Sequence, residues 1–150
     1  MRGKDVDLGL LIFRIAVGGI LLYYGCQKML GTFGGHGFSQ TIGDLQKAGF
    51  PPLLGALSIF AEFFGALGLV TGALTRVAAL GVTVNMAVAT WVVLKQPDVL
   101  THIKLGEGSD ARALFLPVLM CLGALAILCT GAGRFSIDAK LFGKRAPKKS

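Results

Sequence analysis

Three polar residues stand within otherwise apolar stretches and are the first candidates for chemistry: Arg14, Glu62 and Asn85. An arginine and a glutamate can pair, and with an amide beside them they can hydrogen-bond a head group or relay a proton. A lone charge deep in a bilayer costs about 3 kcal/mol on insertion scales, so such residues are expected to face a bundle interior and to pair. The sequence therefore predicts an Arg14–Glu62 ion pair with Asn85 as a neutral neighbour.

The stretches that must position these residues have the length of membrane helices. Hydrophobic residues make up 53% of the 150-residue chain and charged residues only 15%, which is outside the range of soluble globular domains. Four apolar runs each approach the roughly 20 residues that cross a bilayer, and they do not alternate as barrel strands would. They cover 8–30, 53–74, 77–95 and 112–131. The pattern predicts an all-α membrane protein with one four-transmembrane-helix bundle over residues 1–150.

Helical faces and depths indicate whether the three residues can meet. At 100° per residue, Arg14 shares a face with Asp7, Gly18, Gly25 and Lys28, and this face cannot point at lipid. Counting 1.5 Å per residue, Glu62 lies about 15 Å from the outer end of its helix. Asn85 and Arg14 lie about 13 Å and about 9 Å from the inner ends of theirs. These depths predict convergence near the middle of the bilayer.

Two interpretations of the buried residues remain open. The pair either fixes the register of the helices or forms part of a polar pocket that holds a quinone head group or relays a proton. The candidates for the periphery of such a pocket are Tyr23, Tyr24, Lys28 and Trp91. A quinone is thus the candidate cofactor, and no catalytic residue is assigned.

Basic residues predict the topology. The segment 134–150, the N-terminus and the tight turn at Arg76 are rich in Lys and Arg, and the positive-inside rule places such flanks in the cytoplasm. Both termini are therefore predicted to be cytoplasmic in a multi-pass protein of a bacterial inner membrane, with a basic C-terminal tail. The net charge of +7 does not indicate nucleic acid, because these residues are not interleaved with aromatic residues on a soluble surface.

The loop between the first two membrane helices contains a further element. Apolar residues in FSQTIGDLQKAGF, residues 38–50, recur at helical spacing opposite polar ones, after the glycine-rich segment 31–37. This pattern predicts a short amphipathic helix on the outer membrane surface.

Other chemical signals are thin. His36 and His102 lie in the two outer loops beside carboxylates and are weak candidates for a metal site, because they lack a ligand spacing such as H-x-x-x-H. No nucleotide-binding or nucleophile-elbow motif occurs in the chain. The sequence gives no support for nucleotide or acyl chemistry.

The order of several motifs resembles the DoxX family of small four-helix membrane proteins. The resemblance extends over about residues 8–142 and rests on four motifs: Arg14 with Gly25 to Lys28, Glu62 to Gly65, Leu74 to Ala79, and Gly133 to Asp138. It implies association with thiosulfate:quinone oxidoreductase and terminal quinol oxidase complexes, and with a membrane oxidoreductase assembly that includes a sulfurtransferase and a superoxide dismutase. It supplies no catalytic residue set.

Three functional hypotheses follow, and they differ in class. The first is an integral membrane subunit of a redox complex, quinone-linked or coupling a soluble oxidoreductase to the membrane. The second is a non-catalytic membrane anchor or accessory subunit. The third is a small transporter that four short helices could form only as a homo-oligomer. Expected partners are the lipid bilayer and other membrane or soluble subunits; whether the chain is an enzyme stays open.

Overall fold

The computed structural model describes residues 3–95 and 108–142, and every regular element in these ranges is a helix. The helices are α1 (Lys4–Leu30), α2 (Gly37–Lys47), α3 (Pro52–Thr71), α4 (Thr75–Leu94), α6 (Gly108–Thr130) and α7 (Ile137–Phe142). The predicted fold class, an all-α membrane protein with a four-helix bundle, is confirmed.

Among the described residues, four helices are long and apolar enough to cross a membrane: α1, α3, α4 and the Ala113–Thr130 part of α6. At 1.5 Å per residue, 20 residues cover about 30 Å, the thickness of a hydrocarbon core. Both α1 and α3 end at a glycine in the left-handed region, Gly31 with φ 70° and Gly72 with φ 72°. Glycine adopts this conformation without the steric cost that a Cβ atom imposes, which explains why these helices stop there.

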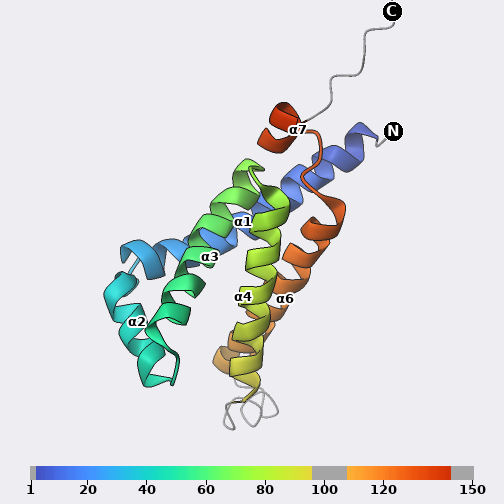
Figure 1. Cartoon of the computed structure of the whole chain (residues 1–150). Helices are drawn as coiled ribbons and strands as arrows, with labels where there is room; N and C mark the ends of the chain where they lie inside the picture. The colour runs from blue at the N-terminus through green and yellow to red at the C-terminus, as the bar shows by residue number, and fades with distance from the viewer. Residues whose placement is uncertain (1–2, 96–107, 143–150) are drawn as a thin grey trace, which may run out of the picture.

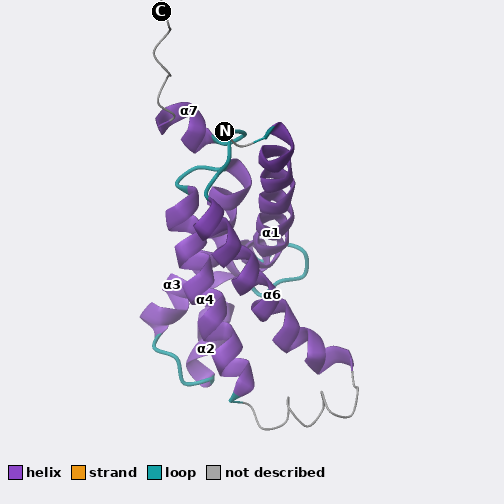
Figure 2. Cartoon of the chain, turned by 90° about the vertical axis from the view of Figure 1, so that its right-hand side faces the viewer, coloured by secondary structure: helices purple, strands orange, loops and turns teal. Residues whose placement is uncertain are grey.

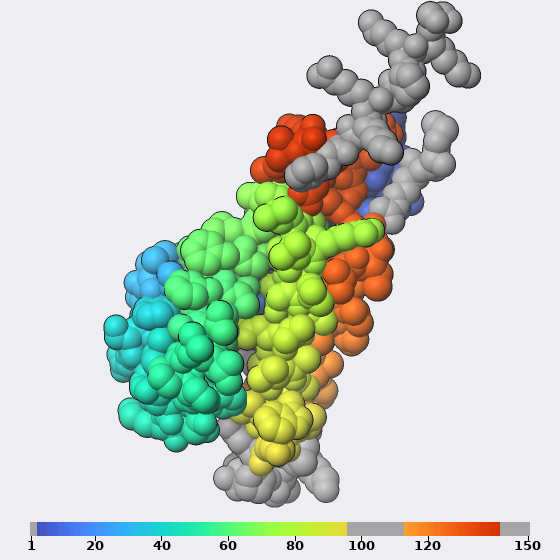
Figure 3. Space-filling view, in the orientation of Figure 1, coloured from blue at the N-terminus to red at the C-terminus, as the bar shows by residue number. Residues whose placement is uncertain are grey.

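The four long helices pack in the order α1, α3, α4, α6. Contacts are most extensive between α4 and α6 and between α1 and α3, and they are few between α1 and α6. In Figure 1, α3 and α4 lie side by side with α1 behind them and α6 beyond α4. The space-filling view shows α3, α4 and α6 in contact along this face (Figure 3). Their shared core is formed by Val17, Leu21, Ala66, Leu69, Ala79, Val82, Met86, Met120, Ala124 and Ile127.

The predicted amphipathic helix is confirmed as α2. It begins after the glycine-rich turn, packs against α3 and α1, and has no buried residue. The ring of Phe38 lies 5.7 Å from that of Phe60 on α3. This helix lies along one end of the bundle, which we call the α2 end (Figure 1).

The opposite end carries the start of α1 and the short helix α7, as Figures 1 and 2 both show, and we call it the termini end. The sequence pattern predicted only a basic tail from residue 134 onward. Instead, residues 131–136 turn back over the bundle and Ile137–Phe142 form a helix. A six-residue helix is too short to produce a recognisable hydrophobic period, so only its contacts reveal it.

Candidate functional site

The polar centre of the bundle is an ion pair between α1 and α3. Lys28 Nζ donates to Oε2 of Glu62 over 2.6 Å. The side chain of Glu62 is 3% exposed, whereas that of Lys28 is 41% exposed. A buried carboxylate therefore has a partner that is itself open to the surface of the bundle.

Glycine makes this pair possible. A Cβ atom at Gly25 would lie 2.9 Å from Cα of Phe63, so α1 and α3 approach each other at backbone distance. Small residues at helix crossings permit such an approach in membranes, where lipid provides no hydrophobic drive for association. Lys28 lies one turn beyond Gly25, and helical side chains lean toward the N-terminus of their helix. Its ammonium group can thus reach Glu62.

A neutral pair lies one turn away on α3. Ser58 Oγ donates to Oδ1 of Asn85 on α4 over 2.6 Å. Ser58 and Glu62 are four residues apart, so both side chains project from the same face of α3. We call Lys28, Ser58, Glu62 and Asn85 the Glu62 site; its residues come from α1, α3 and α4.

Arg14 is not part of the Glu62 site, and the predicted Arg14–Glu62 ion pair is absent. Arg14 is fully buried at the termini end. It donates from Nη1 to the carbonyl oxygen of Ala132, and from Nη2 to that of Phe135 over 2.9 Å.

The register between α1 and α3 separates the two residues. Gly25 lies against Phe63 and Gly18 lies against Val70, so Arg14 falls beside Gly72 at the end of α3. Glu62 precedes Gly72 by about 15 Å of helix. This distance is too great for a direct contact between Arg14 and Glu62. The depths counted along each helix predict a meeting of the two residues because they do not include the axial shift of α1 relative to α3.

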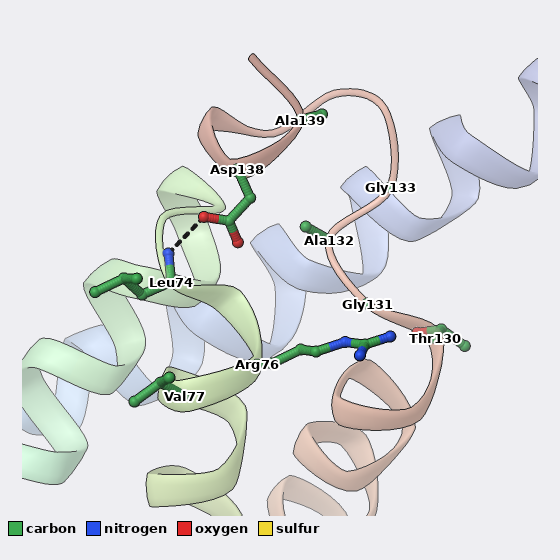
Figure 4. A pocket seen from close by; sticks show the side chains of 9 residues that line it. All are labelled: Leu74, Arg76, Val77, Thr130, Gly131, Ala132, Gly133, Asp138 and Ala139. Atoms are coloured by element: carbon green, nitrogen blue, oxygen red, sulfur yellow. Dashed lines mark hydrogen bonds between the residues drawn. The ribbon is translucent and has the colours of Figure 1, made fainter. Parts of the chain in front are cut away.

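Two aspartates complete a joint at the termini end. Asp138 accepts a hydrogen bond from the backbone N–H of Leu74 over 2.7 Å (Figure 4). It also accepts one from the backbone N–H of Thr75 over 2.8 Å, and its own N–H donates to the Gly72 carbonyl. Asp7 Oδ1 accepts from the backbone N–H of Arg134. Sequence reasoning assigned no role to either aspartate.

The environment of Asp138 shifts its pKa. Burial raises the pKa of Asp138. The hydrogen bonds from Thr75 and Leu74 and the positive charge of Arg14 together lower it by more than burial raises it, so the pKa lies below the ordinary 3.8. A carboxylate at a helix N-terminus is also favoured by the helix dipole. Asp138 is therefore an ionised cap of α4.

The aromatic candidates lie on the surface of the bundle. Tyr23, Tyr24 and Trp91 are all exposed. Tyr23 packs edge-on against Tyr24 and also contacts Phe33, while Lys95 Nζ lies 4.1 Å from the Trp91 ring centroid. Four residues were proposed for the periphery of the pocket. Within the described ranges, Lys28 is the one of these four that is hydrogen-bonded to a residue of the Glu62 site.

The weak metal candidates are placed only in part. His36 Nδ1 lies 3.4 Å from Oδ2 of Asp44, and Lys47 donates to the other oxygen of this carboxylate over 3.3 Å. The hydrogen bonds from Lys47 and His36 lower the pKa of Asp44. His102 lies outside the described residues, and among the described ones no three His, Cys, Asp or Glu residues gather as a metal site would require.

Two comparisons with known proteins match the sequence of this chain. The sequence model of the DoxX family matches residues 9–95, a range that includes Arg14 and all four residues of the Glu62 site. The chain is also 28% identical over 138 residues to the inner membrane protein YqjF of Escherichia coli (strain K12). The alignment covers 92% of this chain and 95% of YqjF. No solved structure gives a significant match.

Proposed function

We propose that this chain, which belongs to the DoxX family of membrane proteins, is an integral subunit of a redox complex and binds a quinone head group at the Glu62 site. The similarity to YqjF, an inner membrane protein, supports placing this multi-pass chain in an inner membrane. The observation that carries the proposal is the Lys28–Glu62 pair, a buried carboxylate bound to a partly exposed lysine within an apolar bundle.

The donor set of this site fits a quinone. When bound, a quinone accepts two electrons and two protons at its carbonyl oxygens. Lys28 would donate a hydrogen bond to one of these oxygens, since an ammonium group has three N–H donors and the pair with Glu62 uses one. Glu62 would exchange a proton with the same oxygen. The hydrogen bond between Ser58 and Asn85 would hold α3 and α4 in place beside the head group.

Access also favours a lipid-soluble ligand. Lys28 is 41% exposed and lies in the last turn of α1, so a head group could reach it from the α2 end of the bundle without crossing the packed core. Electrons would come from a soluble or membrane oxidoreductase partner. This chain would thereby couple that partner to the quinone pool.

The single tryptophan provides the test. Trp91 follows Asn85 on α4 by about 9 Å along the helix axis, within range for quenching by a quinone at the site. We expect a short-chain quinone to quench the fluorescence of the full-length protein in detergent with a saturable curve. Lys28→Met and Glu62→Gln should each weaken this binding about tenfold, the effect of losing one charge-assisted hydrogen bond.

Lys47→Met is the matched control. Lys47 also pairs with a carboxylate, but on the exposed surface of α2, so its removal should leave quenching unchanged. Because a single change at the Glu62 site leaves a buried charge unpaired, the double variant Lys28→Met with Glu62→Leu tests function apart from folding. A folded double variant without saturable quenching supports the proposal. Identical curves for all variants would refute it.

An accessory or anchor role is the second candidate, and the termini end favours it. Arg14 and Asp138, from two of the motifs on which the resemblance rests, both hydrogen-bond to backbone groups of the same joint. On this alternative the Glu62 site only fixes helix register. An anchor should copurify with its partners as a stable complex. Its fluorescence titration with quinone should be the same in the wild type and in the double variant.

The basic residues of 134–150 support cytoplasmic termini. With this topology, the termini end faces the cytoplasm and the α2 end faces outward. A green fluorescent protein fused after Ser150 should fluoresce, and alkaline phosphatase fused there should be inactive. The reverse result would invert the topology.

A further inference from the structure

A pocket of about 490 Å³ lies at the termini end, between the start of α4, the end of α6 and α7. Leu74, just before α4, and Arg76 and Val77 in its first turn line one wall, and Gly131 to Gly133 line it from the segment after α6 (Figure 4). It lies about two helical turns or more from the Glu62 site along α3 and α4, so the proposed quinone site does not account for it.

Arg76 is the notable residue of this pocket. Its guanidinium extends across the opening toward the end of α6 (Figure 4), where a Cβ atom at Gly131 would lie 3.6 Å from Nε. Within residues 3–95 and 108–142, no hydrogen bond or ion pair joins Arg76 to another side chain or to the backbone. Its five N–H donors remain available to a ligand.

The charged residues that line the pocket are Arg76 and Asp138. Asp138 lines the opposite wall, but its two oxygens already accept hydrogen bonds from Leu74 and Thr75. The carbonyl end of α6 contributes a partial negative charge that Arg76 offsets. Two more exposed cations follow lining residues in the sequence, Arg134 after Gly133 and Lys140 after Ala139, but neither lines the pocket itself. Arg76 is the cation of the pocket lining, and the carboxylate of Asp138 in the same lining already accepts two hydrogen bonds, so the guanidinium is left to bind an anion.

The pocket is also apolar on its lipid side. Leu74 is 63% exposed and Val77 is 67% exposed, on a helix whose composition is that of a membrane span. A cation beside exposed aliphatic side chains at the end of such a helix matches the border between lipid head groups and acyl chains. A ligand that combines a phosphate with acyl chains satisfies both halves.

We propose that this pocket binds the head group of an anionic membrane phospholipid, with Arg76 on the phosphate and with Leu74 and Val77 against the upper acyl chain. The guanidinium of Arg76 and the exposed aliphatic side chains beside it carry this inference together. It is independent of any quinone and of the side of the membrane that the termini end faces.

Native mass spectrometry of the full-length protein in detergent tests the proposal. Phosphatidylglycerol and phosphatidylcholine with identical acyl chains are added in turn, and we expect the wild type to retain phosphatidylglycerol preferentially. One cation near a lipid phosphate corresponds to about a fivefold change in affinity, so Arg76→Gln should weaken phosphatidylglycerol binding by about that factor. Arg76→Lys should keep most of the preference.

Lys95→Gln is the matched control. Lys95 is an exposed cation at the other end of α4, so its loss removes the same charge without touching the pocket. Equal retention of the two lipids by the wild type would overturn the proposal, and so would equal losses in Arg76→Gln and Lys95→Gln. Competition by millimolar inorganic phosphate as effective as that by the lipid would overturn it too, because the ligand would then be free phosphate. Thermal unfolding of each variant verifies that the fold is retained.

Discussion

The guanidinium of Arg14 lies directly against Gly72. A Cβ atom at residue 72 would lie 2.8 Å from Arg14 Nη1 and 2.6 Å from Cβ of Ser136, and no side chain fits this space without a shift. Gly72 also has φ 72°, in the left-handed region. The turn between α3 and α4, the buried arginine and the segment after α6 are thus packed into one joint at the termini end.

Gly72→Ala should therefore destabilise the protein by about 2 kcal/mol, from the strained backbone and the displaced Arg14. Thermal unfolding in detergent, followed by circular dichroism, measures the effect. The matched control is Gly81→Ala within α4, where a Cβ atom meets nothing within 4 Å, and this change should be neutral or slightly stabilising. Equal midpoints for the two variants would contradict the packing described for Gly72.

The separation of Arg14 from Glu62 predicts the outcome of two double-mutant cycles. The unfolding free-energy changes of two mutations add within about 0.5 kcal/mol when the residues share no partner. The coupling energy between Arg14→Met and Glu62→Gln should therefore not exceed about 0.5 kcal/mol. Lys28→Met combined with Glu62→Gln should show coupling above about 1 kcal/mol, because these two residues are hydrogen-bonded. The free energy of unfolding by a denaturing detergent measures both cycles. Strong coupling in the first cycle would restore the original pairing hypothesis.

The helices themselves could be predicted from sequence because their signals are local. Four apolar runs near 20 residues identify the spans, and the spacing of residues 38–50 identifies α2. Periodicity also placed Arg14, Gly18, Gly25 and Lys28 on one face of α1, and this face does pack against α3. The sequence indicates Lys28 only as a residue at the periphery of the pocket, whereas in the structure it is the ion-pair partner of Glu62.

The partner of Glu62 could not be predicted because it depends on axial register. Helical periodicity gives the direction in which a side chain points, but it says nothing about how far one helix is shifted along another. The close approaches at Gly18 and Gly25 set this shift. The cap by Asp138 was missed for a related reason: the residue lies 63 positions from Thr75, and no local pattern links them.

Gly25→Ala tests the register directly. A Cβ atom at this position would lie 2.9 Å from Cα and 3.2 Å from N of Phe63, and a backbone cannot move aside as a flexible side chain can. We expect this change to push α1 away from α3, to destabilise the bundle by about 1–3 kcal/mol and to weaken quinone quenching. Gly19→Ala is the control on the same helix, since a Cβ atom there meets nothing within 4 Å. An unfolding midpoint for Gly25→Ala as high as that of the control would show that the two helices do not touch at Gly25.

Asp138→Asn should destabilise the protein at neutral pH by about 1 kcal/mol, because an ionised cap of α4 is lost. The pKa of Asp138 is lower in the folded chain than the ordinary 3.8, so its stabilising effect is complete above that value and disappears as the pH falls through the lowered pKa. The gap in unfolding midpoint between wild type and Asp138→Asn should therefore be widest near pH 7 and shrink below about pH 4. Asp5→Asn, an exposed aspartate in the first turn of α1, controls for general loss of charge. A gap that stays constant from pH 7 to pH 3 would show that the charge of Asp138 does not stabilise α4.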